Sequence, residues 1–406
     1  MRSLVAWVDG RRAGELTEQH LPSGSLFSFE YGPEAAPRDL VSLTMLPSPS
    51  GRRFETSIFP PPFEMILPEG ERRMRIEAAR KIIRSDDFSL LSYVGANPVN
   101  RVRFLTPEAG PEARVPEIPT PREIGDCTSG RALFTQLMQD LDLRQGIAGI
   151  QPKILGAPPV PKVSLDLRQY RGSTHILKSS TAAYPFLAAN EYVCLRAFES
   201  AGLAVPAVTL SVDGELLLVE RFDRLPGGNH LGFEEAAALM GESSASKYQR
   251  DYGSLLEALS QFVSPAAEAA LRRDLTKALV LNWLLGNGDA HLKNFGLLYR
   301  DDADVRLAPF YDCVSTLPYL PNDVPALALS LDWYSKAWWP RAKLEEFGMT
   351  YGKLTSAEMA TVIEESRAGV AGGVSLIRRL GRRIRGITDL SRRMAMLWTE
   401  RMRAFS

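Results

Sequence analysis

The sequence predicts an α+β protein with an N-terminal α+β module, a small strand-rich lobe and a mainly helical C-terminal lobe. Three observations predict this order: a segment with five prolines at 107–122, a strong β-hairpin pattern at 207–222, and apolar residues at helical spacing through 252–285. The expected boundaries are 1–106 for the module, 107–124 for a Pro-rich linker, 125–224 for the strand-rich lobe and 225–406 for the helical lobe.

The N-terminal module is expected to combine strands and helices. Residues 3–10 form a short apolar run that ends in a turn, and residues 26–31 alternate apolar and polar side chains at the period of a strand. A charged helical run is predicted to begin near Pro68, because proline is favoured in the first turn of a helix.

The strand-rich lobe is predicted from five local patterns. A glycine-bearing turn and a short strand lie at 146–156, a second strand at 174–178, and a helix at 187–200 that stops before Gly202. A β-hairpin follows, in which Asp213-Gly214 favours a type I′ turn. Two further short strands are expected around 295–307 in the helical lobe.

The charge and the cysteines exclude several classes of protein. Among 406 residues, basic and acidic side chains number 48 each, so binding of nucleic acid over the whole surface is not expected. The three cysteines are widely spaced, which argues against a disulfide framework and a structural zinc site. No signal peptide and no run of 18 apolar residues is found, so we expect a cytoplasmic protein without membrane contact.

A polar loop at 286–294 carries the strongest chemical signal. Asp289 and Asn294 lie five residues apart, as in the kinase catalytic loop, where the Asp accepts the substrate hydroxyl proton and the Asn holds a metal ion. Asp312 follows 18 residues later and supplies a second oxygen ligand for Mg²⁺. The alternative is a polar loop that only caps a helix, since Asn, Gly and Asp are common in turns. The combination with Asp312 favours the catalytic interpretation.

The candidate phosphate-binding residues lie upstream. Lys178 ends an apolar strand and is a candidate for pairing with the α- and β-phosphates, although lysines at strand ends are also common on surfaces. Glu191, 13 residues later, is its candidate partner, and the neighbouring Asn190 is the alternative. Small residues at 146–152 followed by Lys153 suit a loop that covers phosphates, and a plain turn fits equally well.

Two further positions have a structural and a functional interpretation. Glu220 and Phe222 leave the hairpin where the lobes meet, which is where an adenine ring is usually held, but Phe222 also suits a core. His291 is expected to have a structural or phosphate-facing role, because no second histidine accompanies it at a spacing suited to a metal.

Several blocks resemble the HipA-type serine/threonine kinases, which are toxins of bacterial toxin–antitoxin pairs. The N-terminal blocks are Phe27-Ser-Phe-Glu-Tyr31, Leu67-Pro-Glu-Gly70 and Asp87-Phe-Ser-Leu-Leu91. The kinase blocks are Gly149-Ile-Gln-Pro-Lys153, His175-Ile-Leu-Lys178, Asn190-Glu191, Glu220-Arg-Phe-Asp-Arg224, Lys247-Tyr248, Asn287-Gly-Asp-Ala-His-Leu-Lys-Asn-Phe295 and Ala308-Pro-Phe-Tyr-Asp312. The resemblance therefore covers nearly the whole chain, and its blocks occur in the family's order.

The resemblance implies a two-lobed protein-kinase-like fold of the HipA type, with ATP and Mg²⁺ as cofactors. It implies that Asp289 is the proton acceptor. The residues implied to contact the nucleotide or its magnesium are Ala148, Gly149, Ile150, Gln151, Lys153, Lys178, Glu220, Phe222, His291, Lys293, Asn294, Tyr311 and Asp312.

The resemblance also implies partners. The family's known targets include aminoacyl-tRNA synthetases, and its partner is a small helix-turn-helix antitoxin, HipB-like, which neutralises the kinase and makes most of the DNA contacts. The family's inhibitory phosphoserine would fall at position 146, where this chain has glycine. Self-inactivation at that position is therefore not expected.

Two other functions share parts of this pattern. A small-molecule phosphotransferase would use the same Asp289, Asn294 and Asp312 but would not need residues 1–105, and a non-catalytic corepressor would not need all of these residues together with Lys178. The chain also carries ten arginines between Arg367 and Arg403. They could contact an acidic partner, but one solvated face of an amphipathic helix is the favoured interpretation.

Overall fold

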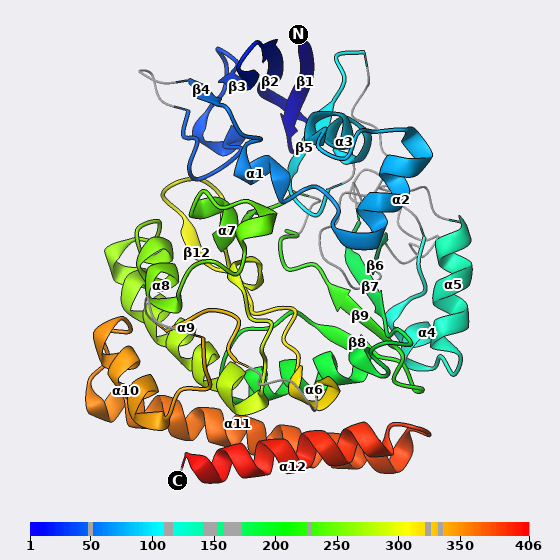
Figure 1. The fold of residues 1–406 in the computed structure, drawn as a ribbon, viewed down its shortest axis with the longest axis vertical. Coiled ribbons are helices and arrows are strands. Elements are labelled where there is room, and N and C mark those ends of the chain that lie inside the picture. Colours follow the sequence, from blue (N-terminus) through cyan, green and yellow to red (C-terminus); the bar gives the residue numbers. More distant parts are fainter. Residues whose placement is uncertain are drawn as a thin grey trace.

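The N-terminal module lies at one end of the molecule and two long C-terminal helices lie at the other, with the two lobes between them (Figure 1). The computed structural model describes residues 1–47, 52–96, 98–108, 117–140, 153–156, 173–225, 229–320, 326–331 and 336–405. Within these ranges, no helix combines the length and the hydrophobicity needed to cross a bilayer.

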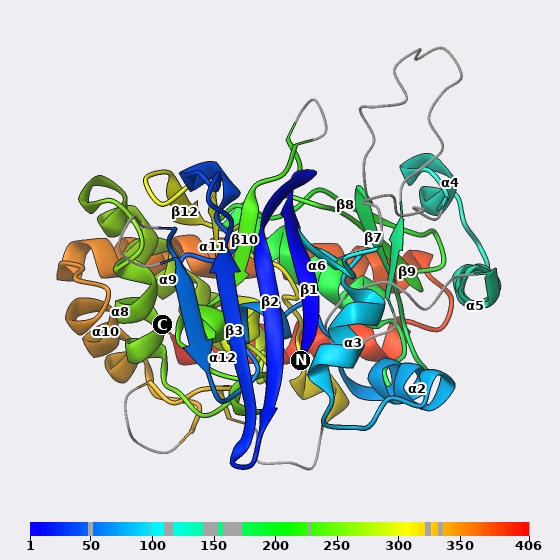
Figure 2. The ribbon, with the colours of Figure 1, turned by 90° about the horizontal axis from the view of Figure 1, so that it is seen from above.

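The N-terminal module is a five-stranded antiparallel sheet with helices on it. The strands are β1 (Arg2–Val8), β2 (Arg11–Leu21), β3 (Gly24–Tyr31), β4 (Arg53–Thr56) and β5 (Val102–Leu105), in the order β4-β3-β2-β1-β5. The helices are α1 (Pro61–Glu64), α2 (Gly70–Arg80) and α3 (Asp87–Val94). Strands at 3–10 and 26–31 are confirmed, and α2 begins two residues after Pro68. Figure 2 shows β1, β2 and β3 side by side, in front of the lobes.

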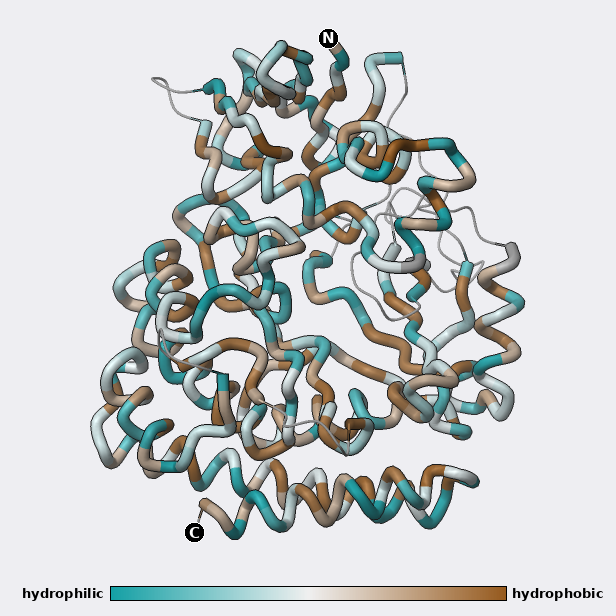
Figure 3. Tube along the Cα trace, viewed as in Figure 1, coloured by the Kyte–Doolittle hydropathy of each residue, from teal (hydrophilic) through white to brown (hydrophobic). Residues whose placement is uncertain are grey.

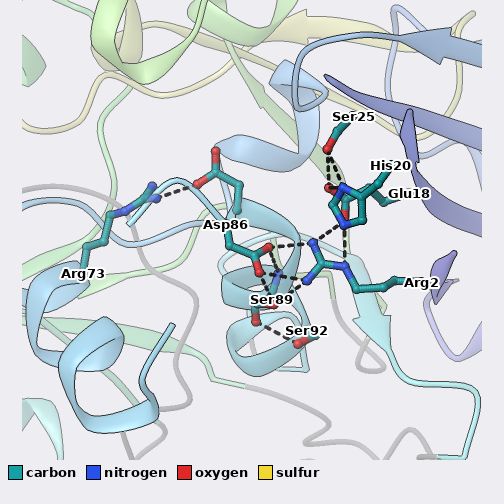
Figure 4. A network of polar contacts seen from close by, with 9 residues as sticks. Arg2, Glu18, His20, Ser25, Arg73, Asp86, Ser89 and Ser92 are labelled. Carbon is teal, nitrogen blue, oxygen red and sulfur yellow. Dashed lines mark hydrogen bonds and ion pairs between the residues drawn. The ribbon is translucent and has the colours of Figure 1, made fainter. Parts of the chain in front are cut away.

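A polar network fixes α3 to this sheet (Figure 4). The Arg2 guanidinium pairs with Glu18 on β2 and, at 2.8 Å, with Asp86, which caps α3 by accepting a hydrogen bond from the Ser89 backbone. The Arg2–Asp86 pair joins the first strand to a residue 84 positions later. Polar contacts therefore stabilise the module in addition to its apolar core, which includes Leu16, Phe29 and Phe104.

The strand-rich lobe is a four-stranded antiparallel sheet in the order β6-β7-β9-β8. Its strands are β6 (Lys153–Gly156), β7 (His175–Ser179), β8 (Val208–Leu210) and β9 (Leu216–Glu220), and its helices are α4 (Pro121–Gly125), α5 (Gly130–Asp140) and α6 (Leu187–Ser200). The strand and helix predicted at 174–178 and 187–200 are confirmed. The end of the predicted linker is wrong as an extended segment: Thr120 caps α4, and Ile118 and Ile124 are buried against this sheet.

The β8–β9 turn differs from the predicted type I′ turn. That turn needs positive φ at both central residues, whereas here Gly214 has φ 75° and Asp213 is not among the residues with positive φ. The Asp213 carboxylate instead accepts hydrogen bonds from Ser211 Oγ at 2.6 Å and from the backbone of Gly130 at 2.6 Å. The aspartate therefore links the hairpin to the start of α5, a contact that the Asp-Gly pair does not reveal.

The helical lobe contains a small sheet. Its strands, in the order β10-β11-β12, are β10 (Gly232–Glu235), β11 (Gly296–Tyr299) and β12 (Val305–Leu307), and the last two confirm the pair predicted around 295–307. Its helices are α7 (Ala236–Leu239), α8 (Tyr252–Ser260), α9 (Pro265–Leu285), α10 (Arg341–Thr350), α11 (Ser356–Arg383) and α12 (Thr388–Ala404). From Leu275 to Leu285, α9 is buried throughout, and its end carries the polar loop to the lobe interface.

The arginine-rich segment forms part of α11 and all of α12, which lie side by side in Figures 1 and 3. Apolar residues such as Ile377, Met394 and Trp398 are buried, whereas eight arginines are exposed. The exposed arginines are Arg378, Arg379, Arg382, Arg383, Arg385, Arg392, Arg393 and Arg403. This arrangement agrees with the expected amphipathic helix that has one solvated face.

Candidate active site

The loop with Asp289 begins where α9 ends. Gly286 closes the helix in the left-handed conformation at φ 68°, a position that glycine adopts at little cost. The Asp289 backbone N–H donates to Asn287 Oδ1 at 3.0 Å, and Asn287 donates to Asn282 of α9 at 2.9 Å. The exposed Asp289 carboxylate accepts a 2.5 Å hydrogen bond from the Tyr248 hydroxyl. The loop is thus held by the buried helix, and the Asp289 carboxylate is oriented by Tyr248.

Several hydrogen bonds join this loop to the segment with Asp312. The Gly288 N–H donates to Thr316 Oγ1 at 2.8 Å, and the Tyr311 hydroxyl donates to the Lys293 carbonyl at 2.7 Å. Asn190 completes the connection from α6, because its side chain exchanges two 2.8 Å hydrogen bonds with the Ser315 backbone. The alternative that Asn190 pairs with Lys178 therefore does not match its position.

Lys178 lies between two carboxylates. Its ammonium group pairs with Glu191 on α6 and with Asp312, and Lys153 on β6 lies 3.5 Å from the second oxygen of Asp312. The side chains of Lys178 and Glu191 are 4% and 1% exposed, whereas that of Asp312 is 33% exposed. The cluster is therefore closed on the Glu191 side and open to a ligand at Asp312.

These charges shift one another's protonation. Burial raises the pKa of Asp312, but the attraction of Lys153 and Lys178 outweighs it and holds the pKa well below its usual value. Burial lowers the pKa of Lys178, yet Asp312 and Glu191 raise it above the ordinary value. Burial also raises the pKa of Glu191. At neutral pH, Lys178 therefore remains a cation and Asp312 an anion.

Asp312 is held in a strained backbone conformation. Its φ of 52° is one that non-glycine residues seldom adopt, at a cost of about 1–3 kcal/mol. Such conformations persist where surrounding contacts enforce them, and here the ion pairs to Lys178 and Lys153 do so. The strain supports the interpretation of Asp312 as a functional residue.

A cleft of about 820 Å³, open solvent at its mouth included, adjoins the cluster. Its charged end is formed by Lys153, Lys178 and Asp312, and its other walls include Glu220, Phe222 and Tyr311. Phe222, Phe233 and Tyr311 contact one another with ring centroids 5.3–5.7 Å apart. An aromatic wall beside a charged end suits a base attached to phosphates.

The N-terminal module supplies another wall of this cleft, which no sequence pattern predicted. Met65, Ile66, Val99 and Asn100 line it together with the two lobes. Glu69 of the same module forms an ion pair with Lys293 and, at 2.9 Å, with Lys247. In the sequence, the blocks Leu67–Gly70 and Lys247-Tyr248 of the family resemblance include these positions, but the blocks by themselves do not indicate that they contact each other.

Three predicted nucleotide-binding residues lie outside the described cleft lining. Lys293 is directed to Glu69 and, at 3.4 Å, to Glu235. The His291 ring meets the Tyr248 ring edge-on, with ring centroids 4.8 Å apart. Burial lowers the pKa of His291 to about 4, so its ring is neutral at pH 7. Asn294 Oδ1 accepts a 3.0 Å hydrogen bond from the His291 backbone. The predicted Ala148, Gly149, Ile150 and Gln151, and the glycine at 146, lie outside the described residues.

The predicted magnesium ligands have suitable chemistry. Within the described ranges, no group of three or more His, Cys, Asp or Glu side chains is arranged to hold a metal ion. Mg²⁺ bound with a nucleotide usually takes only one or two protein ligands besides phosphate and water oxygens. Asp312 offers a partly exposed carboxylate, and the Asn294 oxygen has a second lone pair besides the one that faces His291. The donor atoms of these two residues therefore suit such an ion.

Comparisons with known proteins cover both halves of the chain. Family models described as the HipA N-terminal domain and the HipA-like C-terminal domain match residues 4–105 and 145–372. Y4mE of Sinorhizobium fredii, whose name proposes a kinase, is 30% identical over 352 residues, which cover 82% of this chain and 81% of Y4mE. The serine/threonine-protein kinase toxin HipA of Shewanella oneidensis is 26% identical over 287 residues, 66% of this chain and 65% of that protein.

A solved structure shows the same fold. A chain of the Shewanella oneidensis complex of HipA, HipB and operator DNA superposes with a TM-score of 0.70 at 20% identity, and the match covers 99% of this chain and 96% of that chain. Both family models and the full-length superposition agree with the blocks read from the sequence. The protein therefore belongs to the HipA family of serine/threonine kinase toxins and has its α+β, two-lobed kinase-like fold.

Proposed function

We propose that this protein is an ATP- and Mg²⁺-dependent serine/threonine protein kinase. The observation that carries the proposal is the convergence of Lys153, Lys178 and Asp312 at the charged end of an aromatic-walled cleft. A loop bonded to the Asp312 segment presents Asp289 to solvent, where a protein hydroxyl could reach it. Positioning and electrostatic stabilisation of this kind account for most of the catalysis of phosphoryl transfer.

Each side chain has a defined task in this proposal. Bound MgATP would supply the phosphoryl group and the cation that neutralises its oxygens. Lys178 and Lys153 would bind phosphate oxygens, and Asp312 and Asn294 would hold the cation. Asp289 would accept the proton of the substrate hydroxyl, while the hydrogen bond from Tyr248 keeps its carboxylate oriented. Burial and the Asp289 charge raise the Tyr248 pKa, so Tyr248 stays a donor at pH 7.

The proposal extends to the cellular role. We propose a cytoplasmic toxin that is neutralised by a HipB-like helix-turn-helix antitoxin, reaches DNA only through that antitoxin, and phosphorylates a bacterial protein of the aminoacyl-tRNA synthetase class. Membership of the HipA family and the superposition on a complex named for HipA, HipB and operator DNA support it. A short helix-turn-helix reading frame beside this gene is the expected genomic context.

Asp289→Asn tests the enzymatic part. We expect phosphoryl transfer from radiolabelled ATP to fall by about 10³-fold, because a positioned base contributes roughly 10²–10⁴-fold. Asp302→Asn is the matched control, since Asp302 is an exposed carboxylate in the β11–β12 turn. Near-normal transfer by the Asp289 variant would show that this loop is not catalytic.

A further inference from the structure

The segment between α1 and α2 carries a carboxylate that leaves its own module. Ile66 and Leu67 are each 2% exposed and anchor this segment in the N-terminal core. Pro68 follows, and Glu69 then stands directly before the first residue of α2. Buried residues on one side and a helix on the other fix the backbone at Glu69. Little backbone entropy is therefore lost when its side chain binds residues of the kinase part.

Glu69 contacts two lysines of the helical lobe. One carboxylate oxygen pairs with Lys293, and the other accepts a 2.9 Å hydrogen bond from Lys247. The side chains of Glu69, Lys293 and Lys247 are 16%, 6% and 11% exposed, so solvent screens these contacts little. Burial raises the pKa of Glu69, but the two lysines outweigh burial and lower it to about 2. The carboxylate is therefore charged at every pH at which the protein would act.

Both lysines adjoin residues of the candidate active site. Lys293 directly precedes Asn294, and its carbonyl accepts the hydrogen bond from Tyr311. Lys247 directly precedes Tyr248, whose hydroxyl binds Asp289. The Glu69 carboxylate therefore contacts two lysines that directly precede functional candidates. One precedes Asn294, the candidate metal ligand, and the other precedes Tyr248, the partner of the candidate base.

A second bond strengthens this contact. Glu64, at the end of α1, accepts a 3.1 Å hydrogen bond from the Ser244 backbone, and the Ser244 hydroxyl lies 3.3 Å from the Lys293 ammonium group. The N-terminal module thus holds residues 244–247 and Lys293 at several points. Residues 244–247 and the catalytic loop are in turn joined by the Lys247 carbonyl, which accepts a 3.2 Å hydrogen bond from Leu292.

We propose that Glu69 is a positioning residue for phosphoryl transfer, which makes the N-terminal module part of the catalytic unit. Through Lys293 and Lys247 it sets the places of Asn294 and of the Tyr248–Asp289 pair. The inference rests on the proposed kinase function and adds a role for the module. Displacement of a reacting group by about 1 Å can reduce the rate by roughly 10²-fold even when the altered residue lies outside the chemistry.

Glu69→Gln tests the inference by kinetics. We expect kcat to fall by about 10²-fold while the KM for MgATP changes by less than about threefold, because Lys153, Lys178 and the aromatic wall remain in place. Glu69→Asp keeps the charge and should restore part of kcat. The matched control is Glu77→Gln, which removes a buried carboxylate of α2 whose partner, Arg73, belongs to the same module. The control should keep the wild-type kcat.

Hydrogen exchange separates this inference from the proposed function. In the absence of any substrate, the amides of residues 286–295 should exchange about tenfold faster in Glu69→Gln than in wild type, because a lost loop contact raises local opening. Glu77→Gln should leave them unchanged. Failure of the wild type to phosphorylate any protein would refute the kinase proposal alone. Unchanged exchange of this loop in Glu69→Gln, or an unchanged kcat, would refute the positioning role of Glu69.

Discussion

Two buried lysines of this protein each lie between two carboxylates, but the carboxylates come from different parts of the chain. Lys178 lies between Glu191 and Asp312, and Lys293 lies between Glu69 and Glu235. Around Lys178, both carboxylates come from the two kinase lobes. Around Lys293, one carboxylate comes from the N-terminal module, 224 positions away.

The exposure of the carboxylates distinguishes the two sites. Asp312 is 33% exposed in the cleft, whereas Glu69 and Glu235 are 16% and 11% exposed. A ligand can reach Asp312 and replace part of its pairing with Lys178. Glu235 borders the same cleft, but Lys293 is 6% exposed and lies outside the cleft lining, so we infer that Lys293 holds module and lobe together. A similar arrangement of charges thus serves binding at one site and assembly at the other.

The largest effects on stability are expected at the two buried lysines. Lys293→Met should lower the free energy of unfolding by about 3–5 kcal/mol, because it removes the ammonium group paired with Glu235 and one of the two paired with Glu69. Lys178→Met should also be costly, because it removes the ammonium group paired with Glu191, which is 1% exposed, although Asp312 keeps Lys153 and reaches solvent. Urea unfolding followed by tryptophan fluorescence measures both losses. A loss below about 1 kcal/mol in Lys293→Met would show that this lysine does not compensate the buried carboxylates.

A third buried carboxylate at the module boundary sharpens the comparison, because it has no lysine. Glu234 accepts hydrogen bonds from Ser42 Oγ at 2.6 Å and from the Leu43 backbone at 2.9 Å. Burial raises its pKa to about 7, although these bonds and Arg101 oppose the rise. The folded protein therefore binds this proton more tightly than the unfolded chain. Its stabilising contribution is complete below the unfolded pKa and is lost as the pH rises through about 7.

Glu234→Gln should remove this pH dependence. Between pH 5 and pH 8, the wild type should lose up to roughly 3 kcal/mol more unfolding free energy than the variant. Unfolding of both proteins in urea at several pH values gives the difference, in which the other titrating groups cancel. Identical pH profiles would show that Glu234 does not titrate in this range.

The open site should respond to its ligand. MgATP should stabilise the wild type, by about 2.7 kcal/mol at a concentration 100 times its dissociation constant, and EDTA should remove the metal-dependent part. Asp312→Ala should lose that part, whereas Glu69→Gln should retain most of it, because Asp312, Lys153 and Lys178 stay in place. Thermal midpoints with and without MgATP check both expectations. A metal-dependent shift that survives in Asp312→Ala would exclude Asp312 as a magnesium ligand.

The smallest effect is expected on the outer face of the C-terminal helices. Arg382→Ala should change the unfolding free energy by less than about 0.5 kcal/mol, since its exposed side chain lies on the solvated face of α11. Activity should also be unchanged. A clear loss of stability would show that this arginine makes a contact that its exposure does not indicate.

Much of the kinase part could be predicted from the sequence, because its signals are local. Helix α6 has the expected bounds, and the β8–β9 hairpin and the β11–β12 pair lie where the periodicity predicts them. The five-residue spacing of Asp289 and Asn294 likewise belongs to one loop. In the N-terminal module, only two of the five strands were predicted, because pairing with neighbours, more than the local pattern, selects β2, β4 and β5.

By itself, the sequence determined the main elements of the kinase part and the residue types that a phosphate site requires. The tertiary structure alone decided that Met65 and Ile66 line the cleft, that Ile118 and Ile124 pack against the small sheet, and that Glu69 meets Lys293. A glutamate after a proline indicates only the start of a helix. Its partner is chosen when burial of the apolar surfaces brings module and lobe together, and no local spacing encodes a contact made across 224 positions.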